Sequence, residues 1–451
     1  MVRLRTLWAA INATYWFYPA LASFAAVALA ALTIHLDRSG WSEWLSGMEA
    51  IAPARPESAT NLLTIIAGSM IGVASTVFSI TIAAVAYASG SYGPRLLTNF
   101  MEDKGNQFSL ATFIGTFVYA LAILRVVRAE HERPADVADA AASVLPGFVP
   151  QLSLLTASAL MAVSIGVLVF FLNHIPSSIR INSVLKGIGE RLLDDIRSRF
   201  PNDFTKQEPR RVNGGRTIAA KSTGYIQAID FEGLRKIAEK AECRIALRLR
   251  AGDFVHPGVP LVAIKDGDST EPPDDEIADQ IRTRFTLGGS RTPTMDLQFL
   301  IDELVEIALR ALSPGINDPF TAITALHWIG AATAELAGRD LSRPAGECDD
   351  DRVIPLDDDF AHFLARGFGS ARSAVATDRL AALVALDTLG QAAATVIDAG
   401  RRAQLLHEGG LLMTQARLNL AGPDLVEVEE RHAAFADAIQ TSPSRSSTAR
   451  D

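Results

Sequence analysis

Cysteine is scarce in this sequence of 451 residues, which contains only two, Cys243 and Cys348. The two are far apart and neither belongs to a CxxC pair, so the sequence argues against a disulfide framework and against a thiolate zinc motif. This usage is typical of a protein whose cysteines stay in a reducing compartment.

Catalytic signatures are also missing. The sequence contains no phosphate-binding loop, no dinucleotide-binding glycine fingerprint, no nucleophile elbow and no pair of histidines spaced for zinc. Its aspartate clusters at 349–351 and 357–359 are more typical of a solvated loop than of a cation site. We therefore predict no cofactor, no metal site and no catalytic residue, and an enzyme is the least favoured class of function.

Charge is almost absent from four apolar runs in the first part of the chain. Each run has a length that suits a bilayer-spanning helix, which needs about 20 apolar residues. The runs are Tyr15–Leu36, Asn61–Ser89, Phe108–Leu124 and Val149–Leu172. The sequence therefore predicts a four-helix transmembrane domain at residues 1–175, with the lipid bilayer as its first partner.

Basic residues are distributed unequally between the segments that connect these runs. Segments 1–14, 91–107 and 176–199 together contain 9 Lys and Arg, whereas segments 37–60 and 125–148 contain 5. Because basic residues are retained on the cytoplasmic side, we predict a multi-pass protein of the bacterial inner membrane with both termini in the cytoplasm.

The rest of the chain is charged and acidic. Residues 176–451 contain 33 Lys and Arg against 41 Asp and Glu, a balance that disfavours nucleic acid as a partner. Hydrophobic periodicity and turn residues divide this part into four segments. They are an amphipathic connecting helix at 176–200, a small β-rich module at 201–275, a helical domain at 276–440 and a disordered tail at 441–451. The expected fold class is a mainly α membrane protein: four transmembrane helices followed by a cytoplasmic small β module and a helical domain.

Seven stretches resemble one family. They are WFYPAL at 16–21, VFSITIAAVAYASGSYGPRLL at 77–97, IGTFVYAL at 114–121, GYIQAID at 224–230, AGDFVHPGVPL at 251–261, RTPTMDLQF at 291–299 and ALRALSPGINDPFTA at 308–322. The last is long and unusual enough to be specific. With these stretches the chain is similar to the bacterial predicted membrane proteins filed as domain of unknown function 2254. The resemblance implies four spans and a cytoplasmic C-terminal half, and it implies no established activity.

The second apolar run carries small residues along one helical face. Close helix packing explains such a face and is the reading we favour, because small residues let helices approach each other in lipid. A pore lining is the alternative, because small hydroxyl-bearing side chains leave room for water and bind ions weakly. Phe78 or Ile82 then form an apolar constriction. Arg95, beyond the run, is favoured as a snorkelling anchor over a ring of charge at the mouth. The pore-lining candidates are Gly68, Gly72, Ser75, Thr76, Phe78, Ser79, Ile82 and Arg95.

The stretch SPGINDP at 313–319 separates two helical patterns. Pro314 and Gly315 end the first helix, and Asp318 before Pro319 predicts an N-cap followed by proline at the first helical position. Capping is sufficient to explain Asn317 and Asp318. The alternative is a ligand or subunit contact at an exposed helix N-terminus, with Arg310 as the partner charge.

A second group of polar residues precedes the first of these helices. Arg291, Thr292 and Asp296 have side chains that suit a phosphate or carboxylate site, although Thr292 and Asp296 are also ordinary helix-start residues. We favour the structural role and keep an anionic ligand as the alternative.

These features predict a homo-oligomeric inner-membrane channel or pore-like protein that passes a small ion. The second run lines the axis, and the cytoplasmic domain assembles or gates it. The alternative is a membrane-anchored regulatory or scaffold protein that binds a partner through its cytoplasmic domain.

Overall fold

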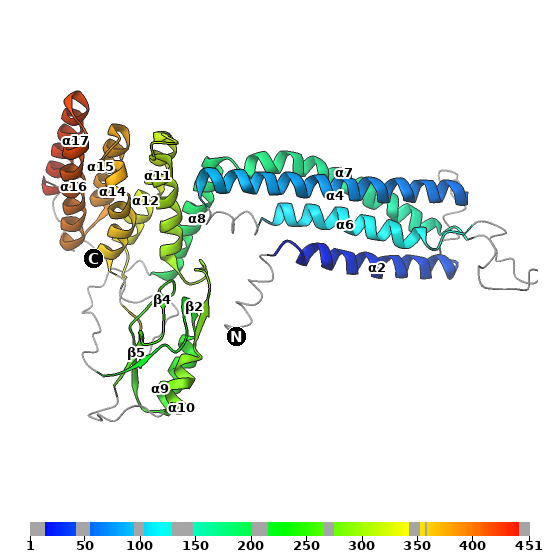
Figure 1. The fold of residues 1–451 in the computed structure, drawn as a ribbon, viewed down its shortest axis with the longest axis horizontal. Helices are drawn as coiled ribbons and strands as arrows, with labels where there is room; N and C mark the ends of the chain where they lie inside the picture. The colour runs from blue at the N-terminus through cyan, green and yellow to red at the C-terminus, as the bar shows by residue number, and fades with distance from the viewer. Residues whose placement is uncertain are drawn as a thin grey trace, which may run out of the picture. The chain divides into compact units, whose positions relative to one another are not determined.

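The fold is given by a computed structural model of the chain (Figure 1). The residues that it describes are 14–41, 55–93, 103–128, 148–200, 215–265, 275–341, 352–356 and 359–441. The chain divides into two compact units, Leu7–Arg180 and Ile181–Asp451. Four apolar helices in the first unit precede a small β module and further helices in the second, which confirms the expected fold class.

Four helices of the first unit are long and apolar enough to cross a membrane. They are α2 (Phe17–Arg38), α4 (Pro56–Tyr92), α6 (Lys104–Leu124) and α7 (Gln151–Ser178). α4, with 37 residues, is longer than the apolar run that predicted it. It begins earlier because Pro56 takes the first helical turn, where the missing proline N–H costs no hydrogen bond.

α6 is the central helix of the first unit. It packs against α2, α4 and α7, and its span is the most buried of the four. The phenol of Tyr119 is enclosed, with its hydroxyl 2.9 Å from Thr33 Oγ1 and 3.3 Å from the carbonyl oxygen of Ser153. Gly115 lies where α6 meets α2, and a methyl group there would lie at an ordinary contact distance of 3.4 Å from the Cβ of Ala22.

Two carboxylates join the helix ends of this unit. Asp37, in the last turn of α2, accepts hydrogen bonds from the backbone N–H groups of Leu152 and Ser153 at 2.9 and 3.0 Å, and so caps α7. Asp103 caps α6 by accepting from the Gly105 N–H at 2.8 Å. The Asp103 carboxylate also lies 2.8 Å from Nε2 of His174 in α7. Both contacts tie a capped N-terminus to a neighbouring helix.

Three helices form the centre of the second unit: α8 (Ile181–Arg199), α11 (Leu297–Ala311) and α12 (Pro319–Ala337). α8 turns one apolar stripe toward the other two helices and leaves its charged side exposed. Gly189 is required where α8 meets α12, because a methyl group there would lie 2.1 Å from the Trp328 ring.

The β module contains two small sheets. The first has the order β1 (Arg216–Ala219), β5 (Pro260–Lys265), β3 (Arg244–Leu247) and β7 (Val353–Ile354); the second has the order β4 (Phe254–Val255), β2 (Gly224–Ile229) and β6 (Phe285–Gly288). All pairs are antiparallel except β3 with β7. Two helices, α9 (Phe231–Lys240) and α10 (Asp275–Arg282), supply buried residues to the same core. β6 and β7 come from within residues 276–440, which the sequence analysis assigns to the helical domain.

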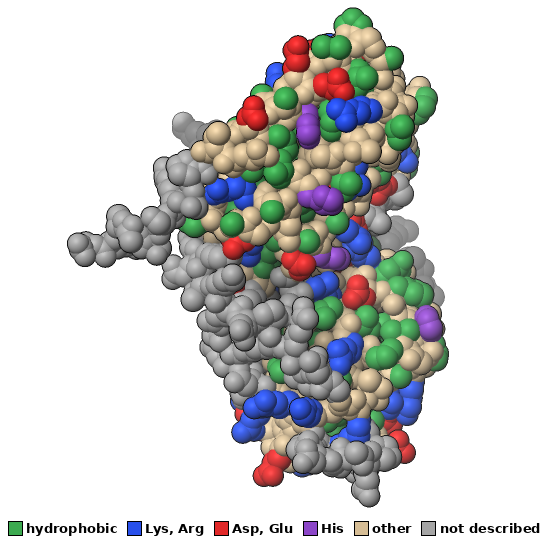
Figure 2. Space-filling view, turned by 90° about the vertical axis from the view of Figure 1, so that its left-hand side faces the viewer, with side chains coloured by type: hydrophobic (Ala, Val, Ile, Leu, Met, Phe, Trp, Pro, Cys, Tyr) green, Lys and Arg blue, Asp and Glu red, His purple; other side chains and the backbone are tan. Residues whose placement is uncertain are grey.

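The C-terminal part of the unit is helical. It comprises α13 (Phe360–Leu364), a π-helical turn (Ala365–Gly369), α14 (Ser370–Val375), α15 (Arg379–Thr395), α16 (Ala399–Asn419) and α17 (Gly422–Thr441). Asp359, Asp378 and Asp398 each cap the helix that follows. Figure 2 views the molecule from the side of α16 and α17. It shows acidic, basic and single apolar side chains interspersed on that side, which is typical of a surface in water.

Candidate functional site

α4 has two faces of opposite character. Ile66, Met70 and Val77 are buried on the side that packs against the other spans. Around the helix from them lie exposed small residues, which we call the small-residue face. Its members are Gly68, Gly72, Ser75, Thr76, Ser79, Ala83 and Ala86, and all seven are exposed. The predicted face therefore exists, and it points away from the core of its own protomer.

The small-residue face has no partner among the described residues of the protomer. A methyl group added at Gly68 or Gly72 would meet no atom within 4 Å. Glycine in a helix interior costs about 1 kcal/mol relative to alanine, and packing inside this protomer does not explain that cost at either position.

Two of the three hydroxyl groups on this face, those of Thr76 and Ser79, are bonded to their own helix. Thr76 Oγ1 donates to the Gly72 carbonyl at 3.0 Å, and Ser79 Oγ donates to the Ser75 carbonyl at 2.9 Å. Each hydroxyl hydrogen is thereby satisfied in an apolar medium, while the oxygen lone pairs remain available on the outer side. The face is therefore compatible both with a second helix and with water or an ion.

The two apolar pore candidates lie beside the small-residue face. Phe78 and Ile82 are 47% and 51% exposed. At 3.6 residues per turn both are rotated from the centre of the face toward one flank, roughly 60–100° around the helix. Arg95 lies outside the described residues.

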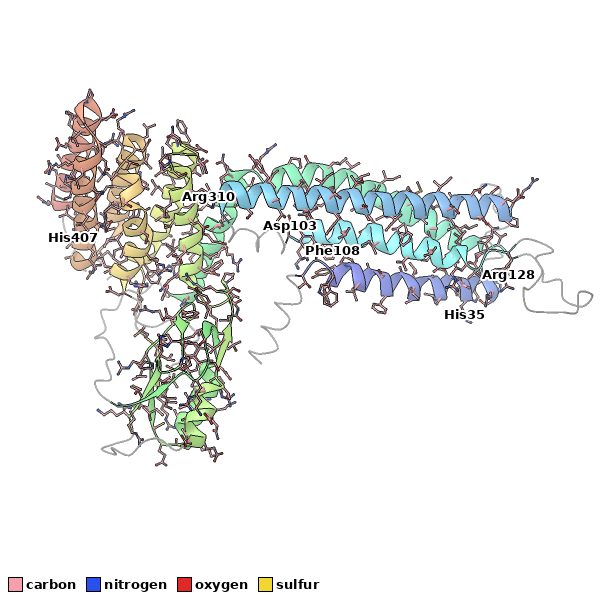
Figure 3. All side chains as sticks on the ribbon, in the orientation of Figure 1. His35, Asp103, Phe108, Arg128, Arg310 and His407 are labelled. Atoms are coloured by element: carbon pink, nitrogen blue, oxygen red, sulfur yellow. The ribbon has the colours of Figure 1, made fainter. Side chains whose placement is uncertain are left out.

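The SPGINDP corner is a closed turn between α11 and α12. Asn317 has a left-handed φ of 49°, and the Asp318 N–H donates to the Ala311 carbonyl at 2.8 Å. The Asp318 carboxylate accepts from the Thr321 N–H at 3.2 Å and from its hydroxyl at 2.6 Å. Pro319 takes the first helical position, as the sequence predicts. Arg310, labelled in Figure 3, lies in the last turn of α11, three residues before the first residue of the corner, Ser313.

This geometry predicts how the corner responds to substitution. Asp318→Asn is expected to leave stability nearly unchanged, because an amide oxygen caps almost as well as a carboxylate. Asp318→Leu is expected to lose about 1 kcal/mol or more, because two donors of Thr321 lose their acceptor. Urea unfolding of the full-length protein in detergent, followed by pulse proteolysis, measures both. If Asp318→Asn abolishes function as fully as Asp318→Leu while the fold stays intact, the charge itself has a role.

Arg291 and Asp296 are brought together as an internal ion pair. Arg291 Nε lies 2.7 Å from Asp296 Oδ2, and Arg291 also donates to Asp302. Asp302 receives a further bond of 2.6 Å from Arg366 Nη2, so two guanidinium groups balance two carboxylates. Asp296 also caps α11 through the Phe299 N–H. These contacts favour the structural role over an anion site.

The pKa values within this cluster are shifted in opposite directions. Burial raises the pKa of the Asp296 carboxyl, and the charge of Arg291 opposes that rise only in part. Burial also acts to raise the pKa of Asp302, but the hydrogen bonds from Arg366 and Arg291 outweigh it and lower that pKa. Thr292 is half-buried in the turn before α11.

The structure adds contacts that the sequence patterns did not indicate. Arg366 reaches Asp302 from the π-helical turn, and His174 reaches Asp103 at the start of α6. Both pairs join residues far apart in the sequence, so no local pattern could have found them. Over the part of the chain that the structure describes, no three His, Cys, Asp or Glu side chains are grouped to hold a metal ion.

Comparison with known proteins gives a family match and uncharacterised relatives. A family model described as "Predicted membrane protein (DUF2254)" matches residues 12–391, a range that includes the small-residue face and the SPGINDP corner. Uncharacterized protein Mb1321c of Mycobacterium bovis and Uncharacterized protein Rv1290c of Mycobacterium tuberculosis are each 29% identical over 377 residues, covering 81% of this chain and 70% of theirs. No solved structure matches the chain.

Proposed function

Because the chain belongs to the family of predicted membrane proteins called DUF2254, we propose that it acts in the bilayer as a homo-oligomeric, pore-like channel whose shared axis is lined by α4. The proposal places it in the inner membrane, with both termini and the second unit in the cytoplasm. The observation that carries it is the small-residue face, which is exposed although α4 is apolar and long enough to cross a membrane.

A second copy of the chain is the neighbour that best suits this face. Other outward surfaces of the spans present large apolar side chains, as at Phe24 in α2 and Val169 in α7, which are 77% and 64% exposed. Such side chains suit contact with lipid tails. Glycine and serine instead let two helices approach closely, which is how helices associate in membranes. The row of small residues on this one face of α4 supports contact with protein or water there.

A path for ions follows from a ring of α4 helices. The small residues leave space along the axis, and the outer lone pairs of Thr76 and Ser79 offer weak oxygen ligands that do not trap an ion. Residues 61–89 contain no charged side chain, so this stretch of α4 imposes no preference for one sign of ion. Phe78 and Ile82 flank the path as apolar gates.

Substitution at these gates tests the channel. Phe78→Ser or Ile82→Ser is expected to raise ion conductance about tenfold or more, equivalent to about 1.4 kcal/mol off the barrier, because a hydroxyl wets an apolar constriction. The measurement is ion flux through the reconstituted protein. Val169→Ser is the matched control, since it makes a similar change on an outward face of α7.

Unchanged conductance in the gate variants would exclude the channel. If both gate variants form intact oligomers that pass no more ions than Val169→Ser, the pore is excluded. The regulatory or scaffold function, in which the cytoplasmic domain binds a partner, then becomes the preferred hypothesis.

A further inference from the structure

The second unit contains a cavity where α8, the β module and the segment before α11 meet. It encloses about 310 Å³ of empty space, counted together with its open mouth. Its walls come from the end of α8, the ends of β2 and β3, the turn after β3, the residue before Asp296 and the residues after β7. Ligand sites have volumes of roughly 300–1,000 Å³, so this cavity suits only a small ligand.

Most of the cavity wall is apolar. Ile229 and Leu247 are 3% and 4% exposed and belong to the core of the β module. Phe231, Leu249 and Leu356 are half-buried and add further apolar surface. None of the described residues that line the cavity carries a carboxylate. An apolar group placed here therefore leaves water and meets no negative charge in the wall.

Two arginines from different elements line the same cavity. Arg199 is the last residue of α8, and its Nη1 donates to the carbonyl oxygen of Met295 at 3.0 Å. Met295 also lines the cavity, so this guanidinium lies at the wall. Arg250 belongs to the turn after β3, where its backbone N–H donates to the Asp253 carboxylate at 2.7 Å. Both arginines are half-buried, and ionic contacts at such positions are screened less than on an open surface.

We propose that this cavity binds a small organic anion, whose phosphate or carboxylate head is held by Arg199 and Arg250 and whose apolar body lies against Ile229 and Phe231. A guanidinium group offers paired N–H donors that match the oxygen atoms of a carboxylate or phosphate. Because the two arginines belong to α8 and to the β module, the bound anion joins these two parts of the second unit. The site is separate from α4, and it stands whether or not α4 lines a pore.

Calorimetric titration with phenyl phosphate tests this site. The full-length protein in detergent is expected to bind this probe saturably. Arg250→Met and Arg199→Met are each expected to weaken the binding at least tenfold, because the phosphate loses one of its two charged partners. Methionine keeps an unbranched apolar stem in place of the arginine stem, so each variant removes the charge with little loss of packing.

Arg248→Met is the matched control. Arg248 lies two residues before Arg250, is exposed, and is not among the described residues that line the cavity. The variant makes the same chemical change and the same change in net charge, and it is expected to bind phenyl phosphate as tightly as the wild type does.

Three results would overturn the proposal. The first is a wild-type protein that shows no saturable binding of phenyl phosphate at millimolar concentration. The second is an equal affinity in the wild type and in both cavity variants, which would mean that the probe binds elsewhere and that Arg199 and Arg250 serve only contacts within the protein. The third is an affinity for inorganic phosphate as high as that for phenyl phosphate, because the apolar wall would then contribute nothing.

Discussion

In the proposed assembly through α4, replacing Gly72 with leucine is expected to dissociate the oligomer while each protomer stays folded. The new side chain meets no atom of its own protomer, because a methyl group at Gly72 has nothing within 4 Å. Leucine also favours the helix by roughly 0.8 kcal/mol relative to glycine. Between two copies of α4, however, the same side chain occupies the space that close helix contact requires. The variant therefore separates the stability of the protomer from the stability of the assembly.

Gly166→Leu provides the control for this experiment. Gly166 lies in α7, is exposed and likewise meets nothing within 4 Å of an added methyl group. The two variants thus make the same chemical change on two outward surfaces of the same bundle. Light scattering after size exclusion in mild detergent should give the wild-type mass for Gly166→Leu and the protomer mass for Gly72→Leu. The wild-type mass for both variants would remove the small-residue face as the interface.

The sequence predicts the spans because the bilayer imposes a simple rule. A segment that crosses it must be apolar over about 20 residues, and that pattern is local. The face that carries Gly68 and Gly72 is equally readable, since helical spacing alone defines it. The sequence does not show that this face points outward, because that depends on which side of α4 packs against α6. That choice is made by long-range packing, in which Met70 and Val77 are buried.

Long-range polar contacts are the part of the structure that the sequence conceals. His174 and Asp103 are 71 residues apart, and Arg366 and Asp302 are 64 apart, so no spacing rule connects them. The Asp318 cap was predictable because its acceptor and donors lie within three residues. The residues around Arg291 show the same limit of sequence reasoning. In the sequence they suit an anion site, but in the structure Asp302 pairs with Arg291 and neutralises its charge.

Replacing Arg372 with methionine is expected to destabilise the C-terminal helices strongly. Arg372 in α14 forms two parallel hydrogen bonds to Glu408 in α16, at 2.7 and 2.8 Å. The Glu408 side chain is only 7% exposed, so the substitution leaves a carboxylate buried without its counter-ion. Breaking one side of a buried pair costs about 3–5 kcal/mol, and the 27% exposure of Arg372 places the expected loss near the lower value.

The double variant Arg372→Met, Glu408→Leu separates the pair from the packing around it. If the loss comes from the unpaired charge, removing that charge as well should restore most of the stability, since apolar side chains of similar volume replace a buried ion pair at little cost. Urea unfolding is measured by pulse proteolysis on the full-length wild type, the two single variants and the double variant in detergent. The four free energies of unfolding give the coupling free energy between Arg372 and Glu408. Additive losses would mean that each side chain acts only through its own contacts. A large coupling would mean that this pair holds α16, which lies beyond the matched residues 12–391, against α14 within them.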